Sequence, residues 1–135
     1  MLKRLRQLGN MRADFAFEST LSSLTFAKFL TTLKRNGYDV AIYYFALTSP
    51  QLAVRRVKLR VLQGGHNVPP DIVRRRYGRS LHNFFNIYMS LADEWTVFDN
   101  SAPPVARQVA TKVQTQLTVT ETATWLKLQN LSKAD

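Results

Sequence analysis

Val-Ala-Ile-Tyr-Tyr-Phe-Ala-Leu, residues 40–47, is the stretch of this chain that decides its fold. The run is uncharged and rich in aromatic and β-branched residues, which is typical of a strand that is covered on both faces. Two shorter stretches, Ala13 to Glu18 and Trp95 to Phe98, also read as strands. Because helical patterns separate these strands along the chain, the sequence predicts an α/β fold with a parallel sheet flanked by helices.

The helical segments are marked by apolar spacing and by residues that start or stop helices. Leu2, Leu5 and Leu8 recur at near-helical spacing, and Gly9-Asn10 is typical of a helix stop. Residues 105–118 are weakly patterned and predict no element. Further helices are expected from Ser22 or Ser23 to Asn36-Gly37, over about 50–62 behind Ser49-Pro50, from Pro69-Pro70, from a cap at Ser80, and near 121–131.

Composition is that of a globular single domain. The chain has 135 residues, 45% of them hydrophobic and 21% charged, with no cysteine and a net charge of +10. The absence of cysteine removes disulfides and thiolate metal sites, and it fits a reducing cytoplasm. No apolar run approaches the roughly 18 residues of a membrane span, so we expect a cytoplasmic protein with no membrane partner. The sequence predicts no metal ligand set.

The charge is concentrated in residues 55–79, on both sides of Gly64-Gly65-His66-Asn67-Val68-Pro69-Pro70. Eight basic residues and one acid lie in this segment, so it carries +7 of the total +10. Two helices joined by paired glycines can swing as a lid, and closure would bring guanidinium groups onto the phosphates of a ligand. The alternative is a solvated basic helix face, or a surface that contacts nucleic acid nonspecifically.

Two of the predicted strands end in a carboxylate, Glu18 and Asp99. Ligands of open parallel sheets bind beyond the carboxyl ends of the strands. A carboxylate there can hold Mg²⁺ through water or accept a hydrogen bond from a substrate hydroxyl. The residues alone leave a second reading open, in which both are loop or helix-cap residues.

Several short motifs, in the same order along the chain, resemble those of one kinase family. Phe-Glu-Ser-Thr-Leu-Ser at 17–22 resembles the Phe-Glu-Thr-Thr-Leu-Ser signature of the zeta-toxin family of P-loop kinases, which includes UDP-N-acetylglucosamine kinases. Ser19 replaces the usual threonine and keeps its hydroxyl group. The likeness covers about residues 5–131. The other matching segments are RVLQGGHNVP (60–69) and IVRRRY (72–77), which look like the family's lid, and LADEW (91–95) and FDNS (98–101).

The resemblance implies roles for particular residues. Glu18, with Ser19 and Thr20, would lie at the acceptor substrate. The complete family domain would use ATP and Mg²⁺ to phosphorylate a hydroxyl group of a small acceptor, with a sugar nucleotide as the family expectation. An antitoxin, or a second copy of the chain, is the protein partner that we expect. The lid arginines that would contact the ATP phosphates are Arg60, Arg74, Arg75, Arg76 and Arg79.

One family motif is missing. The family opens with a strand and a Gly-x-x-x-x-Gly-Lys-Ser/Thr loop, followed by an aspartate base. The five glycines of this chain, at positions 9, 37, 64, 65 and 78, do not start that pattern, and there is no Gly-Lys pair. We therefore expect residues 1–135 to be a single, partial zeta-toxin-like domain, an incomplete P-loop sheet with an arginine-rich lid at about 55–79, with no confident catalytic residue and no activity alone.

The expected incompleteness has two further consequences. A truncated gene product, a misplaced start and one half of a split protein would all give such a chain. Without the central strand, the apolar strand at 40–47 should have an exposed edge, so we expect a chain of low stability that self-associates. The alternative function is a nonenzymatic basic module that binds nucleic acid or a partner protein, although no nucleic-acid motif is recognisable.

Overall fold

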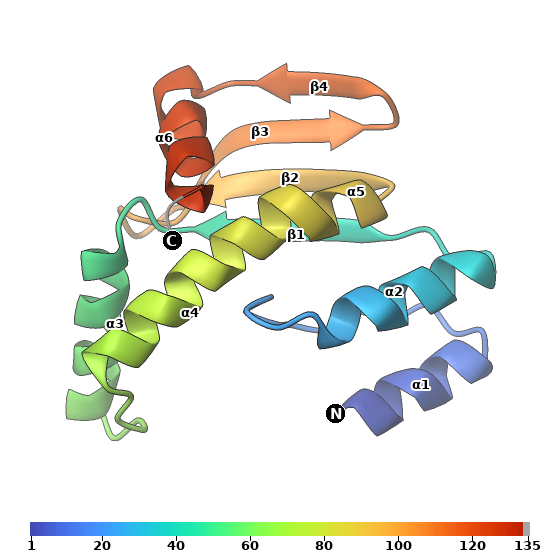
Figure 1. Ribbon diagram of the computed structural model, residues 1–135, viewed down its shortest axis with the longest axis horizontal. Coiled ribbons are helices and arrows are strands. Elements are labelled where there is room, and N and C mark those ends of the chain that lie inside the picture. Colours follow the sequence, from blue (N-terminus) through green and yellow to red (C-terminus); the bar gives the residue numbers. More distant parts are fainter. Residues whose placement is uncertain (134–135) are drawn as a thin grey trace.

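The computed structural model describes residues 1–133 and has a four-stranded mixed sheet with helices (Figure 1). The strand order is β1-β2-β3-β4, with β1 and β2 parallel and the other two pairings antiparallel. The α/β class is confirmed, but the prediction of a parallel sheet is wrong. The bounds are β1 (Ala41–Ala46), β2 (Glu94–Asp99), β3 (Arg107–Val113) and β4 (Gln116–Val119).

All but the last residue of the hairpin β3–β4 lies in the segment 105–118, for which the sequence predicted no element. Only Val109 and Ala110 of this hairpin are buried. The remaining positions are half-buried or exposed, so the apolar alternation that identifies a strand is too weak to detect. Pairing with β2 in register, for example Thr96 opposite Thr111, decides the structure of this segment.

The predicted helices are present, apart from the separate helix that was expected to start at Ser80. That prediction is wrong, because α4 runs through Ser80 to Asn83 and continues into a π-helical turn, η1. The Ser80 hydroxyl bonds to the carbonyl oxygen of Thr20 in a distant loop, so its role is a tertiary contact. The bounds are α1 (Leu2–Asn10), α2 (Thr25–Arg35), α3 (Pro50–Leu62), α4 (Pro70–Asn83), η1 (Phe84–Tyr88), α5 (Met89–Leu91) and α6 (Thr122–Ser132).

The residues that start and stop these helices follow local rules in most places. The Ser49 hydroxyl accepts a hydrogen bond from the Leu52 N–H at 3.2 Å and caps α3 as predicted. Gly37 follows α2 with φ of 92°, a conformation that favours glycine. The cap of α2 was predicted at Ser22 or Ser23, and the Ser23 hydroxyl oxygen does accept a hydrogen bond from the Thr25 N–H at 3.4 Å, although Leu24 occupies the N-cap position itself.

Residues 13–18 do not form the predicted strand. Their side chains alternate between half-buried and exposed, as they would in a strand with one covered face. However, the ring of Phe17 packs on Phe26 and Phe29 of α2, with ring centroids 5.0 and 6.3 Å apart. The alternation shows that one side of this extended segment is buried. Helix α2 covers that side, and no neighbouring strand pairs with the segment.

The core lies on one face of the sheet, where η1 and α6 pack, and it extends to buried residues of α1, α2 and α4. Phe84 of η1 is fully buried and stacks on Tyr44 of β1 with ring centroids 4.3 Å apart. Trp125 of α6 stacks on Trp95 of β2 with ring centroids 5.6 Å apart, and Leu128 of the same helix is fully buried. These contacts place both helical elements over the same face.

The opposite face of the sheet is open. Tyr43 and Phe45 of β1 are 62% and 57% exposed, and Phe45 stacks on Phe98 of β2 with ring centroids 4.9 Å apart. The prediction that the strand at 40–47 is covered on both faces is therefore wrong. An uncharged run shows that a strand is apolar, but it does not show that another element covers it. β1 is also an edge strand of the sheet.

Candidate functional site

The loops that follow β1 and β2 are joined to each other by hydrogen bonds. The Asn100 N–H donates to the carbonyl oxygen of Ala46 at 2.8 Å. The Thr48 N–H donates to the hydroxyl oxygen of Ser101 at 3.0 Å, and the Thr48 and Ser101 hydroxyl oxygens lie 3.1 Å apart. These contacts hold the carboxyl ends of the two parallel strands together as one rim, the position at which open α/β sheets bind ligands.

Asp99 is the last residue of β2, and protein donors occupy both of its carboxylate oxygens. The Ser101 N–H donates to Oδ1 at 2.9 Å, and Arg107 Nη2 donates to Oδ2 at 3.2 Å. Burial alone would raise the pKa of Asp99, but the hydrogen bonds from Ser101 and the charge of Arg107 outweigh it and hold the pKa below its ordinary value. This arrangement favours the reading of Asp99 as a residue that orders the loop.

The arginine-rich hairpin consists of α3, the turn 63–69 and α4, and its base is attached to the rim. The Arg56 guanidinium donates to the carbonyl oxygen of Asn100. The Tyr77 hydroxyl donates to the carbonyl oxygen of Leu47 at 2.6 Å, and burial raises the pKa of Tyr77, so this hydroxyl keeps its proton at neutral pH. From this base the hairpin projects away from the sheet (Figure 1).

The arginines that were predicted to contact a nucleotide are exposed. Within residues 1–133, none of them forms an ion pair with a carboxylate. Their guanidinium groups are therefore free to bind an anion from outside the chain. These residues are Arg60 on α3 and Arg74, Arg75, Arg76 and Arg79 on α4.

The orientation of α4 distinguishes among its arginines. Ser80 and Asn83 contact the loop that precedes α2, which fixes the face of α4 on that side. Residues three, four and seven apart lie on the same side of a helix. Arg76 precedes Ser80 by four residues and Asn83 by seven, and Arg79 precedes Asn83 by four, so both lie on this side. Arg74 lies on the opposite side.

The residues that were predicted to contact the acceptor lie in an exposed loop. Glu18, Ser19 and Thr20 are all exposed. The Ser19 hydroxyl oxygen accepts a hydrogen bond from the Leu21 N–H at 3.1 Å, and the hydroxyl oxygens of Thr20 and Ser22 lie 2.8 Å apart. The two hydroxyl groups therefore order the turn, whereas the Glu18 carboxylate has no such role in the described part of the chain.

Helix α4 holds this loop through side chains that bond to loop carbonyl groups. The Ser80 hydroxyl donates to the carbonyl oxygen of Thr20, and Asn83 Nδ2 donates to that of Leu21 at 2.8 Å. The Tyr44 hydroxyl of β1 lies 2.7 Å from the Ser80 hydroxyl oxygen. The predicted acceptor loop and the predicted lid helix are thus brought together beside the sheet.

Sequence reasoning missed the residues that hold the candidate site in place. Arg56 belongs to the segment predicted to be the lid but was not among its proposed phosphate ligands, Asn83 belongs to a segment identified only as helical, and Ser80 was read as a cap. Tyr88, buried in η1, also donates to the loop, at 2.7 Å from its hydroxyl to the carbonyl oxygen of Ser23. Their partners are backbone carbonyl groups distant in the sequence, and a single sequence contains no signal for such pairs.

Two kinds of feature are absent from the part of the chain that the structure describes. Among residues 1–133, no group of three or more His, Cys, Asp or Glu side chains is arranged to hold a metal ion. None of the helices in that range is long and apolar enough to cross a membrane.

Fold and site together define an α/β protein that carries a cationic helical hairpin at the carboxyl ends of its parallel strands. The chain belongs to the zeta toxin family, whose sequence model, described as "Zeta toxin", matches residues 2–116. It is 38% identical over 63 residues to an uncharacterized protein of Haemophilus influenzae, which covers 47% of this chain and 45% of the relative. The matched region thus spans about half the length of that relative. No solved structure matches the chain.

Proposed function

We propose that this chain supplies the lid and the acceptor loop of an ATP-dependent phosphotransferase that acts on a hydroxyl group of a small acceptor, with a sugar nucleotide as the first candidate. The observation that carries the proposal is the contact of α4 with the loop 18–23. Ser80 and Asn83 bond to the carbonyl groups of Thr20 and Leu21. An acceptor bound at the loop would therefore lie beside the arginines of α4.

Glu18 is the proposed ligand of the acceptor. Its side chain is exposed at the start of a loop whose backbone is bonded to α4. Phe17, directly before it, is packed on α2, which fixes the position of the backbone at Glu18. A carboxylate held in this way can accept a hydrogen bond from a substrate hydroxyl group and so orient it for attack. Ser19 and Thr20 would act indirectly, by keeping the turn in shape.

The arginines of the hairpin are the proposed ligands of the ATP phosphates. Phosphoryl transfer depends on positioning and on neutralising the charge of the transferred group. Arg76 and Arg79 lie on the side of α4 that faces the loop, so we assign them to the phosphate nearest the acceptor. Arg60 and Arg75 would contact the outer phosphates as the hairpin closes, and Arg74 would contribute least.

The sequence of the chain limits what it would do alone. It contains no Gly-x-x-x-x-Gly-Lys segment that could cradle phosphates through backbone N–H groups. Asp99, the carboxylate at the end of β2, is bonded to Ser101 and Arg107, so we propose that it orders the loop and does not bind Mg²⁺. We therefore assign phosphate and acceptor binding to this chain, and no catalytic base or magnesium ligand.

Activity measurements test this division of roles. Phosphate transfer from radiolabelled ATP to UDP-N-acetylglucosamine should be undetectable with residues 1–135. It should appear when a strand and a Gly-x-x-x-x-Gly-Lys-Ser loop from a complete family member precede the chain. Turnover by the unextended chain would falsify the assignment, and so would an extended chain that folds, binds ATP and transfers nothing to any hydroxyl acceptor.

Matched arginine variants test the orientation of α4. In the unextended chain, calorimetric titration with ATP at low salt should show weak binding. Arg76→Gln and Arg79→Gln should each reduce the affinity several-fold, about 1 kcal/mol for each lost charge-assisted contact. Arg74→Gln removes the same charge from the opposite side of the helix and is the control. Equal losses from all three variants would point to unspecific charge attraction.

One observation supports a second candidate, which is nonspecific binding of nucleic acid. The exposed arginines extend around α4, with Arg74 on the side away from the acceptor loop, and a long polyanion could contact several sides of the hairpin. Binding to a single-stranded oligonucleotide should then weaken equally in Arg74→Gln and Arg79→Gln, with a steep dependence on salt. Affinity that is lost at physiological salt would leave the phosphotransferase role as the better account.

A further inference from the structure

The outer edge of β1 carries backbone groups that no strand pairs. β1 ends the sheet on its side and pairs only with β2. The carbonyl oxygens of Val40 and Ala46 accept hydrogen bonds from the β2 side, so the even-numbered residues here pair with β2. The odd-numbered residues direct their N–H and C=O groups to the free edge, where these groups have no hydrogen-bond partner among residues 1–133: Ala41, Tyr43 and Phe45.

The segment 13–18 is a second extended stretch with free backbone groups. It has the alternating exposure of a strand, and Phe15 and Phe17 pack against the core. From residue 14 to residue 18, no backbone N–H or carbonyl group forms a hydrogen bond within the described part of the chain. Extended backbone with unpaired groups is a template for a further strand.

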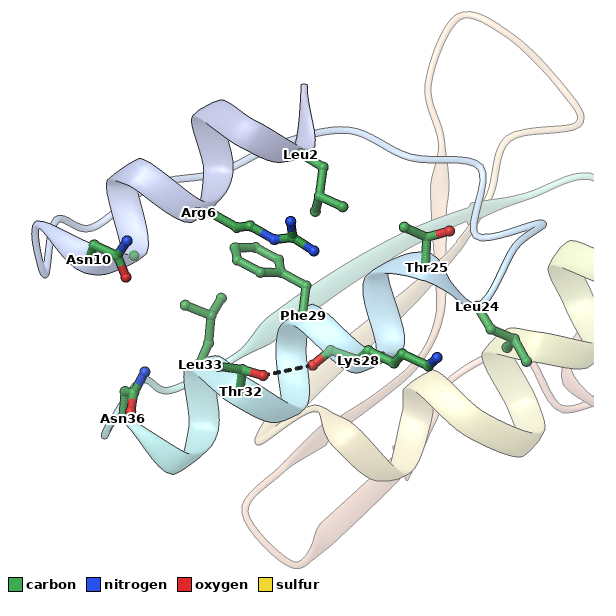
Figure 2. A pocket seen from close by; sticks show the side chains of 11 residues that line it. Leu2, Arg6, Asn10, Leu24, Thr25, Lys28, Phe29, Thr32, Leu33 and Asn36 are labelled. Atoms are coloured by element: carbon green, nitrogen blue, oxygen red, sulfur yellow. Dashed lines mark hydrogen bonds between the residues drawn. The ribbon is translucent and has the colours of Figure 1, made fainter.

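The segment 13–18 and β1 run in the same direction. Figure 2 shows Asn10 and Asn36 at one end of the helix pair α1 and α2, and Thr25 at the other end. The segment returns from Asn10 to the start of α2, and β1 returns from the end of α2 that carries Asn36 (Figure 1). Both stretches therefore run opposite to α2.

Side-chain hydrogen bonds hold the two stretches beside each other at both ends. The Tyr38 hydroxyl, just before β1, donates to the carbonyl oxygen of Ala13 at 2.7 Å. At the other end, the Tyr44 hydroxyl contacts Ser80, which bonds to the carbonyl oxygen of Thr20. Directly paired strands lie about 4.8 Å apart. A tyrosine side chain with its hydrogen bond is longer than that spacing, so these bridges leave room for one strand between the two stretches.

We propose that a single extended strand of a partner polypeptide inserts between β1 and the segment 13–18 and pairs with both. One strand would satisfy the free backbone groups of two edges at once. A second copy of the chain would bring a whole sheet, so the segment would have to move away. The charged residues of the two stretches, residues 13–18 and 39–46, are all acidic, so the inserted strand is apolar with basic ends: Asp14, Glu18 and Asp39.

Amide NMR titration of the whole chain with the peptide Lys-Val-Ile-Val-Thr-Ile-Lys tests the proposal without ATP or acceptor, so its outcome is independent of the proposed phosphotransferase role. Saturable binding is expected, with shifts concentrated in residues 13–18 and 41–46. Two control peptides carry N-methyl groups on alternate residues, each set removing the donors of one edge. Each should bind at least roughly tenfold more weakly. Full binding of either control overturns insertion between two edges, and shifts centred on α3 and α4 overturn the site.

Matched substitutions at Tyr43 test the β1 edge. Tyr43→Pro removes an N–H that faces the free edge and leaves the pairing with β2, because proline is tolerated at the outer edge of a sheet. It should weaken peptide binding at least roughly tenfold. Tyr43→Ala removes the same exposed ring, keeps the N–H and should retain binding. Unchanged affinity in Tyr43→Pro, or equal losses in both variants, overturns the proposal. If thermal unfolding shows that Tyr43→Pro is not folded, the methylated peptides decide.

Discussion

The Ser80 hydroxyl of α4 donates a hydrogen bond to the carbonyl oxygen of Thr20, which ties the helix of the proposed lid to the loop of the proposed acceptor site. Ser80 also contacts the Tyr44 hydroxyl at 2.7 Å, so three elements meet at one side chain. Burial raises the pKa of Tyr44 to about 12, so the Tyr44 hydroxyl keeps its proton at neutral pH. Lid movement would then be confined to the part of the hairpin that precedes this contact.

Loss of the Ser80 hydroxyl should loosen the acceptor loop more than it destabilises the fold. Ser80→Ala removes the donor to Thr20 and is expected to lower the free energy of unfolding by about 1 kcal/mol. Urea unfolding measures that change, and hydrogen exchange should accelerate at residues 19–23. Ser90→Ala is the control, because Ser90 is exposed and bonds only to Ile87 of its own turn. A similar effect of both substitutions would show that the hydrogen bond to Thr20 does not stabilise the acceptor loop.

Two of the three glycines in the helical hairpin, Gly65 and Gly78, should change the free energy of unfolding in opposite directions when they are replaced by alanine. A Cβ atom at Gly65 would lie 2.9 Å from the carbonyl oxygen of Arg60, so Gly65→Ala forces the turn to move and should cost about 1 kcal/mol or more. A Cβ atom at Gly78, inside α4, meets nothing within 4 Å. Gly78→Ala should therefore stabilise the chain by about 0.5–1 kcal/mol. Thermal unfolding of both variants measures whether each substitution stabilises or destabilises the chain. Destabilisation by Gly78→Ala would contradict the placement of Gly78 on an open side of α4.

Asp93 should make the free energy of unfolding depend on pH under acidic conditions. The Val40 N–H donates to Asp93 Oδ2 at 2.7 Å, and Lys34 lies 3.2 Å from Oδ1. The hydrogen bond from Val40, assisted by Lys34, holds the pKa of Asp93 below its ordinary value. Since the unfolded chain then binds protons more readily, this stabilisation is complete above the ordinary carboxyl pKa and is lost as the pH falls through the lower folded value.

The variant Asp93→Asn measures this effect. At neutral pH it should be less stable than the natural chain by about 1 kcal/mol or less, because the half-exposed ion pair is screened by water. The difference in urea unfolding should shrink as the pH is lowered to about 3. Asp39→Asn, which removes an exposed carboxylate with no ion pair among residues 1–133, should show no such trend. A difference that grows in acid would reverse the sign assigned to Asp93.

The open face of β1 should promote self-association. β1 is an edge strand without charge or proline, and Phe45 on it is 57% exposed. Phe45→Lys places a charge there and should reduce the sedimentation coefficient at high protein concentration. Val105→Lys adds the same charge at a position that is 70% exposed outside the strands and should have little effect. A natural chain that stays monomeric at every concentration would rule out association through this strand.

The sequence alone determined the elements whose signals are local. The strand at 40–47 was recognised from its continuous apolar composition, and α3 from its Ser49-Pro50 start, because these signals lie within a few residues of each other. The family was also recognisable from short motifs, and the family match over residues 2–116 confirms it. The separation of Arg74 from Arg79 on α4 was not recognisable, because it depends on which side of the helix meets the loop.

Only the tertiary structure decided how these elements are used. It made residues 107–119 a hairpin, left one face of β1 open, and placed the segment 13–18 on α2 without a strand partner. It also joined Ser80 and Asn83 to the acceptor loop. The physical reason is the same in each case. Composition determines whether a segment can bury apolar side chains or donate hydrogen bonds, whereas the partner that accepts them is set by chain segments distant in sequence.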